Sequence, residues 1–387
     1  MAILHPALES SVRTVLSEEL LSGLRERARA HDESNTFARQ DFDALVAAGY
    51  LKALLPVERG GAGWGLAEAA AAQRLLGAHA PGTALAVNMH LVWAGVVHLL
   101  HTKADHRLDF VDDWIETGHV LAFGISEPGN DHVLFDSTTR AEEGADGVRY
   151  TGRKIFTSLS PAWTRLGVFG KNDGGELVHA FVDREDPGVT IGDDWDTLGM
   201  RASQSQSTRL DGALASPEWV HTRLPVGPQP DALVFGIFGA FLTLTASVYA
   251  GIADRALELA AEHPAKRRSL AADRSLDQDP DIRWRVAEAG MDVVALDAFL
   301  TQITCDLDAG VDHGSAWFPK LVSLRTRAGD VARSSVDAAL KVSGGGQYYR
   351  GSELERLYRD VLASLYHPSD SESAHATVAN WLLGPLQ

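Results

Sequence analysis

The residues best suited to acid–base chemistry lie near the C-terminus, in the run Tyr366-His367-Pro368-Ser369-Asp370. A neutral imidazole accepts a proton near pH 7, and its charge state responds readily to its surroundings, so His367 could act as a general base. The same run also has a structural interpretation. Pro368 would stop a preceding helix, whose end favours a histidine, while Ser369 and Glu372 would form a capping box for the next helix. Both interpretations of His367 stay open from the sequence.

Composition excludes several classes of partner. The 387 residues include 35 basic and 52 acidic side chains, which give a formal net charge of −17. Such a charge repels nucleic acid and anionic membranes, so we expect neither as a partner. The single cysteine, Cys305, excludes internal disulfides, and the 15 histidines show no HExxH or paired ligand spacing, so we predict no metal site. Because Met1 to Ser10 lack a signal-peptide pattern and no apolar run reaches about 18 residues, we expect a cytoplasmic protein.

Hydrophobic periodicity divides the chain into three predicted domains. Residues 1–117 are rich in alanine and leucine at helical spacing, which predicts an N-terminal helical domain. Residues 118–225 contain short alternating runs between glycine, aspartate and asparagine turns, which predicts a β domain. Long apolar segments return in residues 226–387 and predict a second helical domain. Its predicted helices include Ala240 to Ala261, Arg283 to Leu307 and Phe318 to Val342.

Short motifs occur in all three predicted domains. They are Pro56-Val57-Glu58-Arg59-Gly60-Gly61-Ala62-Gly63, Ser126-Glu127-Pro128, Phe156-Thr157-Ser158, Leu198-Gly199-Met200-Arg201-Ala202-Ser203, Ser343-Gly344-Gly345-Gly346-Gln347 and Glu355-Arg356-Leu357-Tyr358-Arg359-Asp360. Together they resemble the acyl-CoA dehydrogenase superfamily over nearly the whole chain. The resemblance implies an α+β, mainly helical fold with an N-terminal helical domain, a middle β-barrel and a C-terminal four-helix bundle. It also implies a flavin-dependent oxidoreductase that binds FAD and forms a homodimer or homotetramer.

The resemblance places a flavin ring against two of these motifs. Phe123, Ile125 and Ser126 would meet its pyrimidine edge, whose carbonyl and N–H groups suit backbone groups and a hydroxyl. Positions 156 and 158 of a strand share a face, so Phe156 would pack on the ring while Ser158 faces its N5 edge. Without the resemblance, the same residues would be interpreted as a strand-closing turn, a core aromatic and a strand-end hydroxyl.

Four further residues are implied to act at a subunit interface or a domain junction. Arg267 would reach a flavin pyrophosphate across the interface, although a solvated basic cluster explains it equally well. Gly344 and Gly345 would let the backbone approach a partner's dinucleotide, or would simply end a helix. Gln347 stands where the family has a glycine. Arg201 could form an ion pair at a domain junction or contact an anionic substrate group.

The reaction is less constrained than the fold. Relatives that dehydrogenate acyl thioesters use a glutamate to remove an α-proton, whereas this chain has His367 at one of the two usual positions and Phe241 at the other. One hypothesis is a dehydrogenase of an acyl thioester or related small molecule, with His367 as base and an electron-transfer protein as partner. A second is a two-component monooxygenase, in which a flavin reductase supplies reduced FAD or FMN. A third is a catalytically silent subunit of a mixed oligomer.

Overall fold

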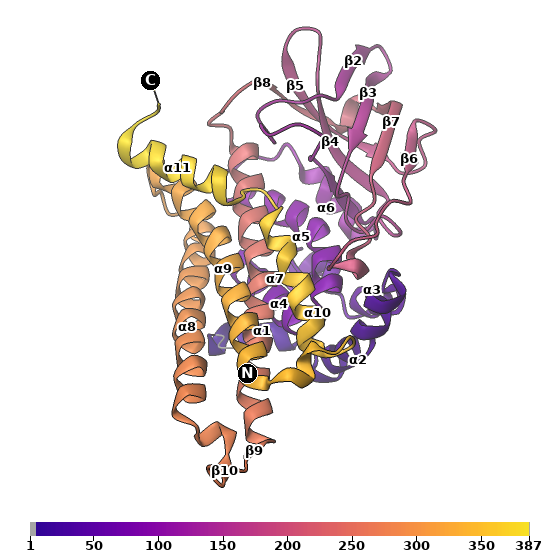
Figure 1. Ribbon diagram of the computed structural model, residues 1–387. Coiled ribbons are helices and arrows are strands. Elements are labelled where there is room, and N and C mark those ends of the chain that lie inside the picture. The colour runs from indigo at the N-terminus through magenta and orange to yellow at the C-terminus, as the bar shows by residue number, and fades with distance from the viewer. Residues whose placement is uncertain (1–4, 387) are drawn as a thin grey trace.

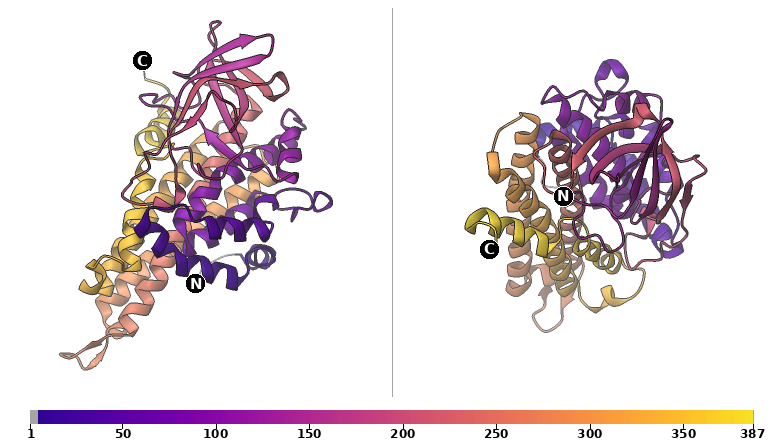
Figure 2. Two further views of the ribbon diagram at one scale, coloured as in Figure 1. Left: turned by 90° about the vertical axis from the view of Figure 1, so that its right-hand side faces the viewer. Right: turned by 90° about the horizontal axis from the view of Figure 1, so that it is seen from above.

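The computed structural model describes residues 5–386, in which helices precede and follow a region of strands (Figure 1). Residues 1–4 and 387, which belong to the first and third predicted domains, lie outside the described range. The predicted α+β fold with helical N- and C-terminal parts is confirmed. Figure 2 shows the sheet at one end of an elongated helical body and the small hairpin of β9 (Arg268–Ser269) and β10 (Arg274–Ser275) at the other.

The N-terminal part consists of helices that pack beside the central helix of the bundle. They are α1 (Pro6–Arg13), α2 (Glu18–Ser34), α3 (Arg39–Ala47), α4 (Leu66–His79), α5 (Pro81–His101) and α6 (Asp109–Glu116). The start of α2 is fixed by the Ser17 hydroxyl, which accepts a hydrogen bond from the Leu20 amide at 3.2 Å. The helix ends at Asn35, whose φ of 51° lies in the left-handed region. Ser17 and Asn35 thus fix the two ends of α2, and this helix forms one side of the domain junction.

The middle part is one mixed sheet. Its strands are β1 (Leu121–Gly124), β2 (Arg140–Gly144), β3 (Gly147–Lys154), β4 (Arg165–Lys171), β5 (Glu176–Asp183), β6 (Val189–Ile191), β7 (Thr208–Ala215) and β8 (Val220–Pro225). The hydrogen-bonded order is β6-β7-β3-β2-β4-β5-β8, and β1 pairs in parallel with β4, with Leu121 opposite Arg165. Strands β1 and β3 therefore end at loops that the remaining structure brings against the helices.

The C-terminal part is a helical bundle, and the three long helices predicted there are all present. The helices are α7 (Ala232–Ala265), α8 (Pro280–Asp308), α9 (Trp317–Ser343), α10 (Glu353–Val361) and α11 (Ser371–Leu383). Helix α7 contacts α4, α5, α8 and α9 and is the centre of the fold. A Cβ added at Gly251 would lie 2.2 Å from the Arg74 carbonyl oxygen, so α4 and α7 pack more closely than another residue would allow.

Two helices, α5 and α7, are long and apolar enough to span a membrane. Their most apolar windows are 94% and 83% buried inside the fold, respectively. Burial against neighbouring helices accounts for this composition, since helices that are apolar all round occur in the cores of large proteins. The two segments are therefore the core helices of this structure.

Candidate functional site

The predicted site residues meet at a cavity of about 320 Å³ between the sheet and the helices. We call it the junction cavity. Five of the predicted residues line it, namely Phe123, Ser126, Phe156, Ser158 and His367. Leu85 and Met89 of α5 add an apolar side that the sequence did not indicate, because these residues look like ordinary core positions of a helix. Phe241 of α7, which stands at the second usual position of the catalytic base, lies on the same cavity. The cavity thus combines elements from every part of the chain.

One wall of the junction cavity is held by a buried ion pair between Glu127 and Lys154. The Lys154 ammonium lies 2.6 Å from Glu127 Oε1, and neither side chain is exposed. Glu127 also accepts hydrogen bonds from Ser137, Thr138 and Thr139. The loop after Ser126 is thereby tied to the end of β3, which leads to Phe156. Glu127 belongs to the Ser126-Glu127-Pro128 motif, but nothing in the sequence indicates Lys154 as its partner.

This environment keeps the Glu127 carboxylate ionised. Burial is the largest influence and by itself would raise the pKa, but the charge of Lys154 and the hydrogen bonds from Thr139 and Ser137 outweigh it. The pKa of Glu127 is lowered to about 2. Glu127 is therefore a structural anion at neutral pH and is not available as a proton acceptor.

The predicted strand through Phe156 and Ser158 is wrong, because β3 ends at Lys154. Phe156 has a φ of 57°, and the Ser158 amide donates a 2.9 Å hydrogen bond to the Phe156 carbonyl, so the backbone turns sharply here. Both residues still line the junction cavity. An aromatic residue with a left-handed backbone conformation is uncommon and usually marks a special position. The turn leaves the Phe156 ring 52% exposed beside the edge of Trp195.

These residues fit the ring of a flavin. The exposed face of Phe156 suits an aromatic plane, and the junction cavity is otherwise mostly apolar. Ser158 and Ser205 share a hydrogen bond of 2.8 Å, whereas the Ser126 hydroxyl makes none within residues 5–386. An adjoining cavity of about 830 Å³ shares Ser126, Phe156 and Tyr366 with the first. A flavin ring could therefore lie against the residues that the two cavities share, and further groups could extend into either cavity.

His367 faces the junction cavity but is a weak base. Its Nε2 is shielded from solvent and has no hydrogen-bond partner within residues 5–386. Burial, reinforced by the positive charge of Arg325, lowers the pKa of His367 to about 3. Arg325 is fixed in place because it donates a 3.0 Å hydrogen bond to the His367 carbonyl. The imidazole is therefore neutral at physiological pH and holds an added proton poorly.

The capping box predicted from Ser369 and Glu372 is not formed. Helix α11 begins one residue later than that prediction requires, and Asp370 is its N-cap. The Asp370 carboxylate accepts a 2.9 Å hydrogen bond from the Ser373 amide. Aspartate satisfies a free helix amide as well as serine does, so the sequence alone could not fix the cap position. This run therefore does begin a helix, as the structural interpretation predicted, but the N-cap is Asp370 and not Ser369.

Carboxylates are absent from the lining of the junction cavity. Among residues 5–386, none that lines it is an aspartate or glutamate. The adjoining cavity has three, but Glu127 is paired with Lys154, Asp370 caps α11 and the Asp131 side chain is 94% exposed. No lining carboxylate of the two cavities is thus both free and enclosed.

The run Glu355 to Asp360 joins all three parts of the chain. Arg359 forms paired hydrogen bonds with Asp32 of α2, at 3.0 and 2.6 Å, and also binds Glu355 and the Leu198 carbonyl. Asp360 accepts a hydrogen bond from the Met200 amide, and burial raises its pKa to about 6. This motif therefore has a structural role beside the cavity, since Arg359 also forms part of the lining.

The remaining predicted residues lie elsewhere. Arg201 serves the junction, because it pairs with Asp196 at 2.8 Å and donates to the Asp32 carbonyl. Ile125 is 4% exposed and borders a small pocket behind Phe123. Arg267 donates a 2.8 Å hydrogen bond to the Ser343 carbonyl, next to Gly344, and Gly345 follows. Arg267, Gly344 and Gly345 lie at the end of the bundle opposite the sheet, beside β9, and not around the junction cavity (Figure 1).

The chain is similar to known proteins along most of its length. Family models for the acyl-CoA dehydrogenase N-terminal and C-terminal domains match residues 5–106 and 243–371. An L-evernosamine nitrososynthase from Micromonospora sp. is 29% identical over 94% of this chain and 88% of its own length. A putative acyl-CoA dehydrogenase, YdbM, from Bacillus subtilis is 25% identical over 89% of each chain.

A solved structure is similar over the whole chain. It is KijD3 in complex with FMN and dTDP-3-amino-2,3,6-trideoxy-4-keto-3-methyl-D-glucose. Its TM-score is 0.87 at 26% sequence identity, and the match covers 100% of this chain and 96% of KijD3.

The Glu127–Lys154 pair gives a prediction for stability. Replacing Glu127 with Gln leaves a buried ammonium without its counter-charge, so the free energy of unfolding at pH 7 should fall by about 3 kcal/mol. The pKa of Glu127 is lowered from 4.5 to about 2, so the pair's contribution is complete above the unfolded pKa and is lost as the pH falls toward about 2. The difference between wild type and Glu127→Gln should therefore shrink below pH 4.5. Urea unfolding at a series of pH values measures it.

Glu143→Gln is the matched control for this prediction. Glu143 pairs with Arg223 at 3.2 Å, but both side chains are more than 40% exposed. Removing an exposed pair should cost less than about 1 kcal/mol at any pH. Equal losses in the two variants at pH 7 would contradict the structural role of Glu127.

Proposed function

The chain belongs to the acyl-CoA dehydrogenase superfamily of flavin-dependent oxidoreductases, and from this premise we propose that it is a two-component monooxygenase acting on a small amine. In this proposal a separate reductase supplies reduced flavin. The substrate nitrogen and O2 then meet in the junction cavity.

The observation that carries the proposal is the absence of a suitable base in the junction cavity. Dehydrogenation of an acyl thioester requires a group that removes an α-proton. None of the described residues that line this cavity is a carboxylate, and the pKa of His367 is lowered to about 3. Oxygenation of an amine has no such α-proton to remove. The residues present therefore suit oxygenation better than dehydrogenation.

Reduced flavin supplies two electrons, so that one atom of O2 enters the substrate and the other leaves as water. The chain's own residues orient the reactants and exclude solvent. Phe156 provides a plane for the ring, and Ser126 offers a free hydroxyl to its polar edge. Leu85, Met89 and Phe241 keep the opposite side apolar, which protects reactive oxygen species from water. Neutral His367 lines the junction cavity without adding a charge, and its Nε2 points into the protein.

The lining of the adjoining cavity supports a polar substrate. It offers the imidazole of His132 and the amide of Asn380, whereas the side chains of Asn130 and Thr377 are hydrogen-bonded within the protein. A flat hydrocarbon would leave these groups without hydrogen-bond partners, whereas a hydroxyl-rich amine can pair with them. The nitrososynthase named for L-evernosamine and the amino-sugar nucleotide held by KijD3 point the same way, so we propose an amino sugar as the substrate class. The FMN of KijD3 favours FMN here, with FAD as the alternative.

Coupled turnover distinguishes this proposal from dehydrogenation. With a flavin reductase, NADH and FMN in air, we expect an amino sugar to gain oxygen on nitrogen, as detected by mass spectrometry. Oxidised flavin on the protein should not bleach when acyl thioesters are added without oxygen, because no base removes the α-proton.

Flavin bleaching by an acyl thioester, with no oxygenated amine, would instead support the dehydrogenase. The similarity to YdbM motivates that alternative. A protein that binds no flavin in either redox state would contradict both and leave the silent subunit.

His367 gives a second prediction, on pH dependence. Because its pKa is lowered to about 3, the imidazole stays neutral throughout the range from pH 5 to pH 8 and contributes no titration there. His367→Gln should therefore keep the shape of the profile of kcat/KM against pH, and KM for the amine should change by less than about threefold, because the shielded Nε2 makes no hydrogen bond that the variant would lose. An inflection near pH 6.5 that disappears in the variant would contradict this role.

We also propose that the chain forms a homodimer or homotetramer through its bundle. Large apolar side chains are exposed on α8, where Trp284 is 72% and Met291 is 61% exposed. Monomeric proteins rarely leave such patches open to water. Arg267 and Gly344 lie at the free end of the same bundle, as a contact to a partner's flavin requires.

The assembly can be measured by light scattering after size exclusion. Wild type should have the mass of a dimer or tetramer, and a Trp284→Glu, Met291→Glu double variant should be monomeric because two charges would be buried in the interface. Val57→Glu places a charge on an apolar side chain that is 70% exposed in the N-terminal part, and it should leave the mass unchanged. A monomeric wild type would contradict the proposal.

A further inference from the structure

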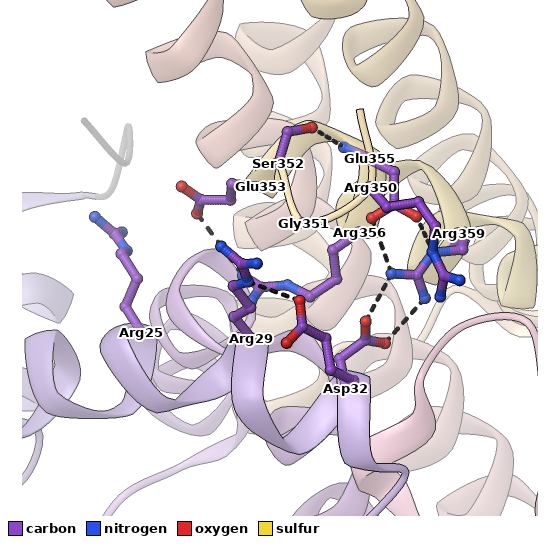
Figure 3. Close-up of a pocket in the computed structure, with 11 residues that line it drawn as sticks. Arg25, Arg29, Asp32, Arg350, Gly351, Ser352, Glu353, Glu355, Arg356 and Arg359 are labelled. Carbon is purple, nitrogen blue, oxygen red and sulfur yellow. Dashed lines mark hydrogen bonds and ion pairs between the residues drawn. The ribbon is translucent and has the colours of Figure 1, made fainter. Parts of the chain in front are cut away.

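A second cavity, of about 460 Å³, lies between α2 and the turn that leads into α10 (Figure 3). We call it the arginine cavity. Five arginines and four acidic residues line it: Arg25, Arg29, Arg350, Arg356, Arg359, Asp32, Glu33, Glu353 and Glu355. It is distinct from the junction cavity, although Arg359 lines both. A local excess of positive charge is notable in a chain whose net charge is −17.

Two of the five arginines are neutralised by the acids beside them. Arg359 is bound by Asp32 and Glu355, as described above. Arg29 pairs with Glu33 at 2.8 Å. These pairs use three of the four carboxylates of the arginine cavity.

The fourth carboxylate is also taken, by an arginine from outside the cavity. Arg255 of α7 binds both oxygens of Glu353, at 2.9 and 2.8 Å. Arg356 lies only at 4.0 Å from the same carboxylate. The acids of the arginine cavity therefore form no hydrogen bond to Arg25, Arg350 or Arg356, although the charge of Glu353 acts on Arg25 and Arg356 and that of Asp360 acts on Arg356.

Those three arginines retain unused donors. Arg356 is 6% exposed, yet its Nε has no hydrogen-bond partner within residues 5–386. The Nε of Arg25 is equally shielded and unpartnered, and the side chain makes one hydrogen bond, of 3.3 Å, to the Ala78 carbonyl. Figure 3 draws no dashed line to Arg25. Arg350 forms no ion pair or side-chain hydrogen bond with any residue in the described range.

Buried guanidinium donors without acceptors are costly, and an anion with several oxygens removes that cost. We propose that the arginine cavity binds a phosphate-bearing anion. Phosphate presents acceptors in several directions, which suits three guanidinium groups from different elements better than a single carboxylate does. The first turn of α10, at Glu353, also opens onto the cavity, and a helix N-terminus favours negative charge. The proposal is independent of the reaction in the junction cavity.

Titration calorimetry with inorganic pyrophosphate, at low salt and on the purified full-length protein, tests the site. We expect saturable binding, with an affinity at least about tenfold weaker in Arg25→Gln and in Arg350→Gln, because each loses a charge-assisted contact. Arg350 is exposed in a turn, so its variant should fold normally. Arg285→Gln makes the same charge change on an exposed position of α8 and should bind like wild type.

The same titration on flavin-loaded protein identifies the source of the phosphate. Binding with flavin retained indicates a free phosphate ligand, whereas release of FMN but not of riboflavin indicates that the cavity holds the phosphate of the flavin itself. Either result upholds an anion site. Absence of saturable heat in both forms, or equal affinities of Arg25→Gln, Arg350→Gln and Arg285→Gln, would overturn the proposal.

Discussion

The candidate site depends on the buried ion pair between Glu127 and Lys154. A charged pair without solvent exposure is stable only when its remaining hydrogen-bonding capacity is satisfied, and Glu127 meets this condition through Ser137, Thr138 and Thr139. The pair ties the loop after Ser126 to the end of β3, so Ser126 and Phe156 reach the same cavity. Without it, two loops that are separate in the sequence would not share a wall.

Arg359 provides the second constraint, because it connects α2, the loop before Met200 and α10. Its carboxylate partners keep the junction rigid beside the candidate site. Weak basicity of His367 follows from the same close packing, since burial and the nearby Arg325 disfavour the charged imidazole. The chain therefore uses its ionisable groups near the junction cavity mainly to position other residues. A site that abstracts a proton would instead need one of these ionisable groups to be free to act as a base.

The sequence predicted much of the fold and part of the site. Helical periodicity located the long helices α7, α8 and α9, and motif resemblance selected five residues that line the junction cavity. The sequence-based predictions were wrong or incomplete where contacts between distant residues decide the local structure. The left-handed turn at Phe156, the cap at Asp370 and the partner of Glu127 depend on residues distant in sequence or on equal local preferences. Arg25 resembles an ordinary surface arginine, and only the packing of α2 against α10 brings it to the same cavity as Arg356.

Oxygen transfer is the central claim, and isotopically labelled O2 tests it most directly. The protein would be supplied with enzymatically reduced flavin and an amino sugar under labelled O2, and the product examined by mass spectrometry. The account predicts that the oxygen bound to the product nitrogen carries the label, because it derives from O2. An oxidised product without label, or one formed equally well in the absence of O2, would contradict it.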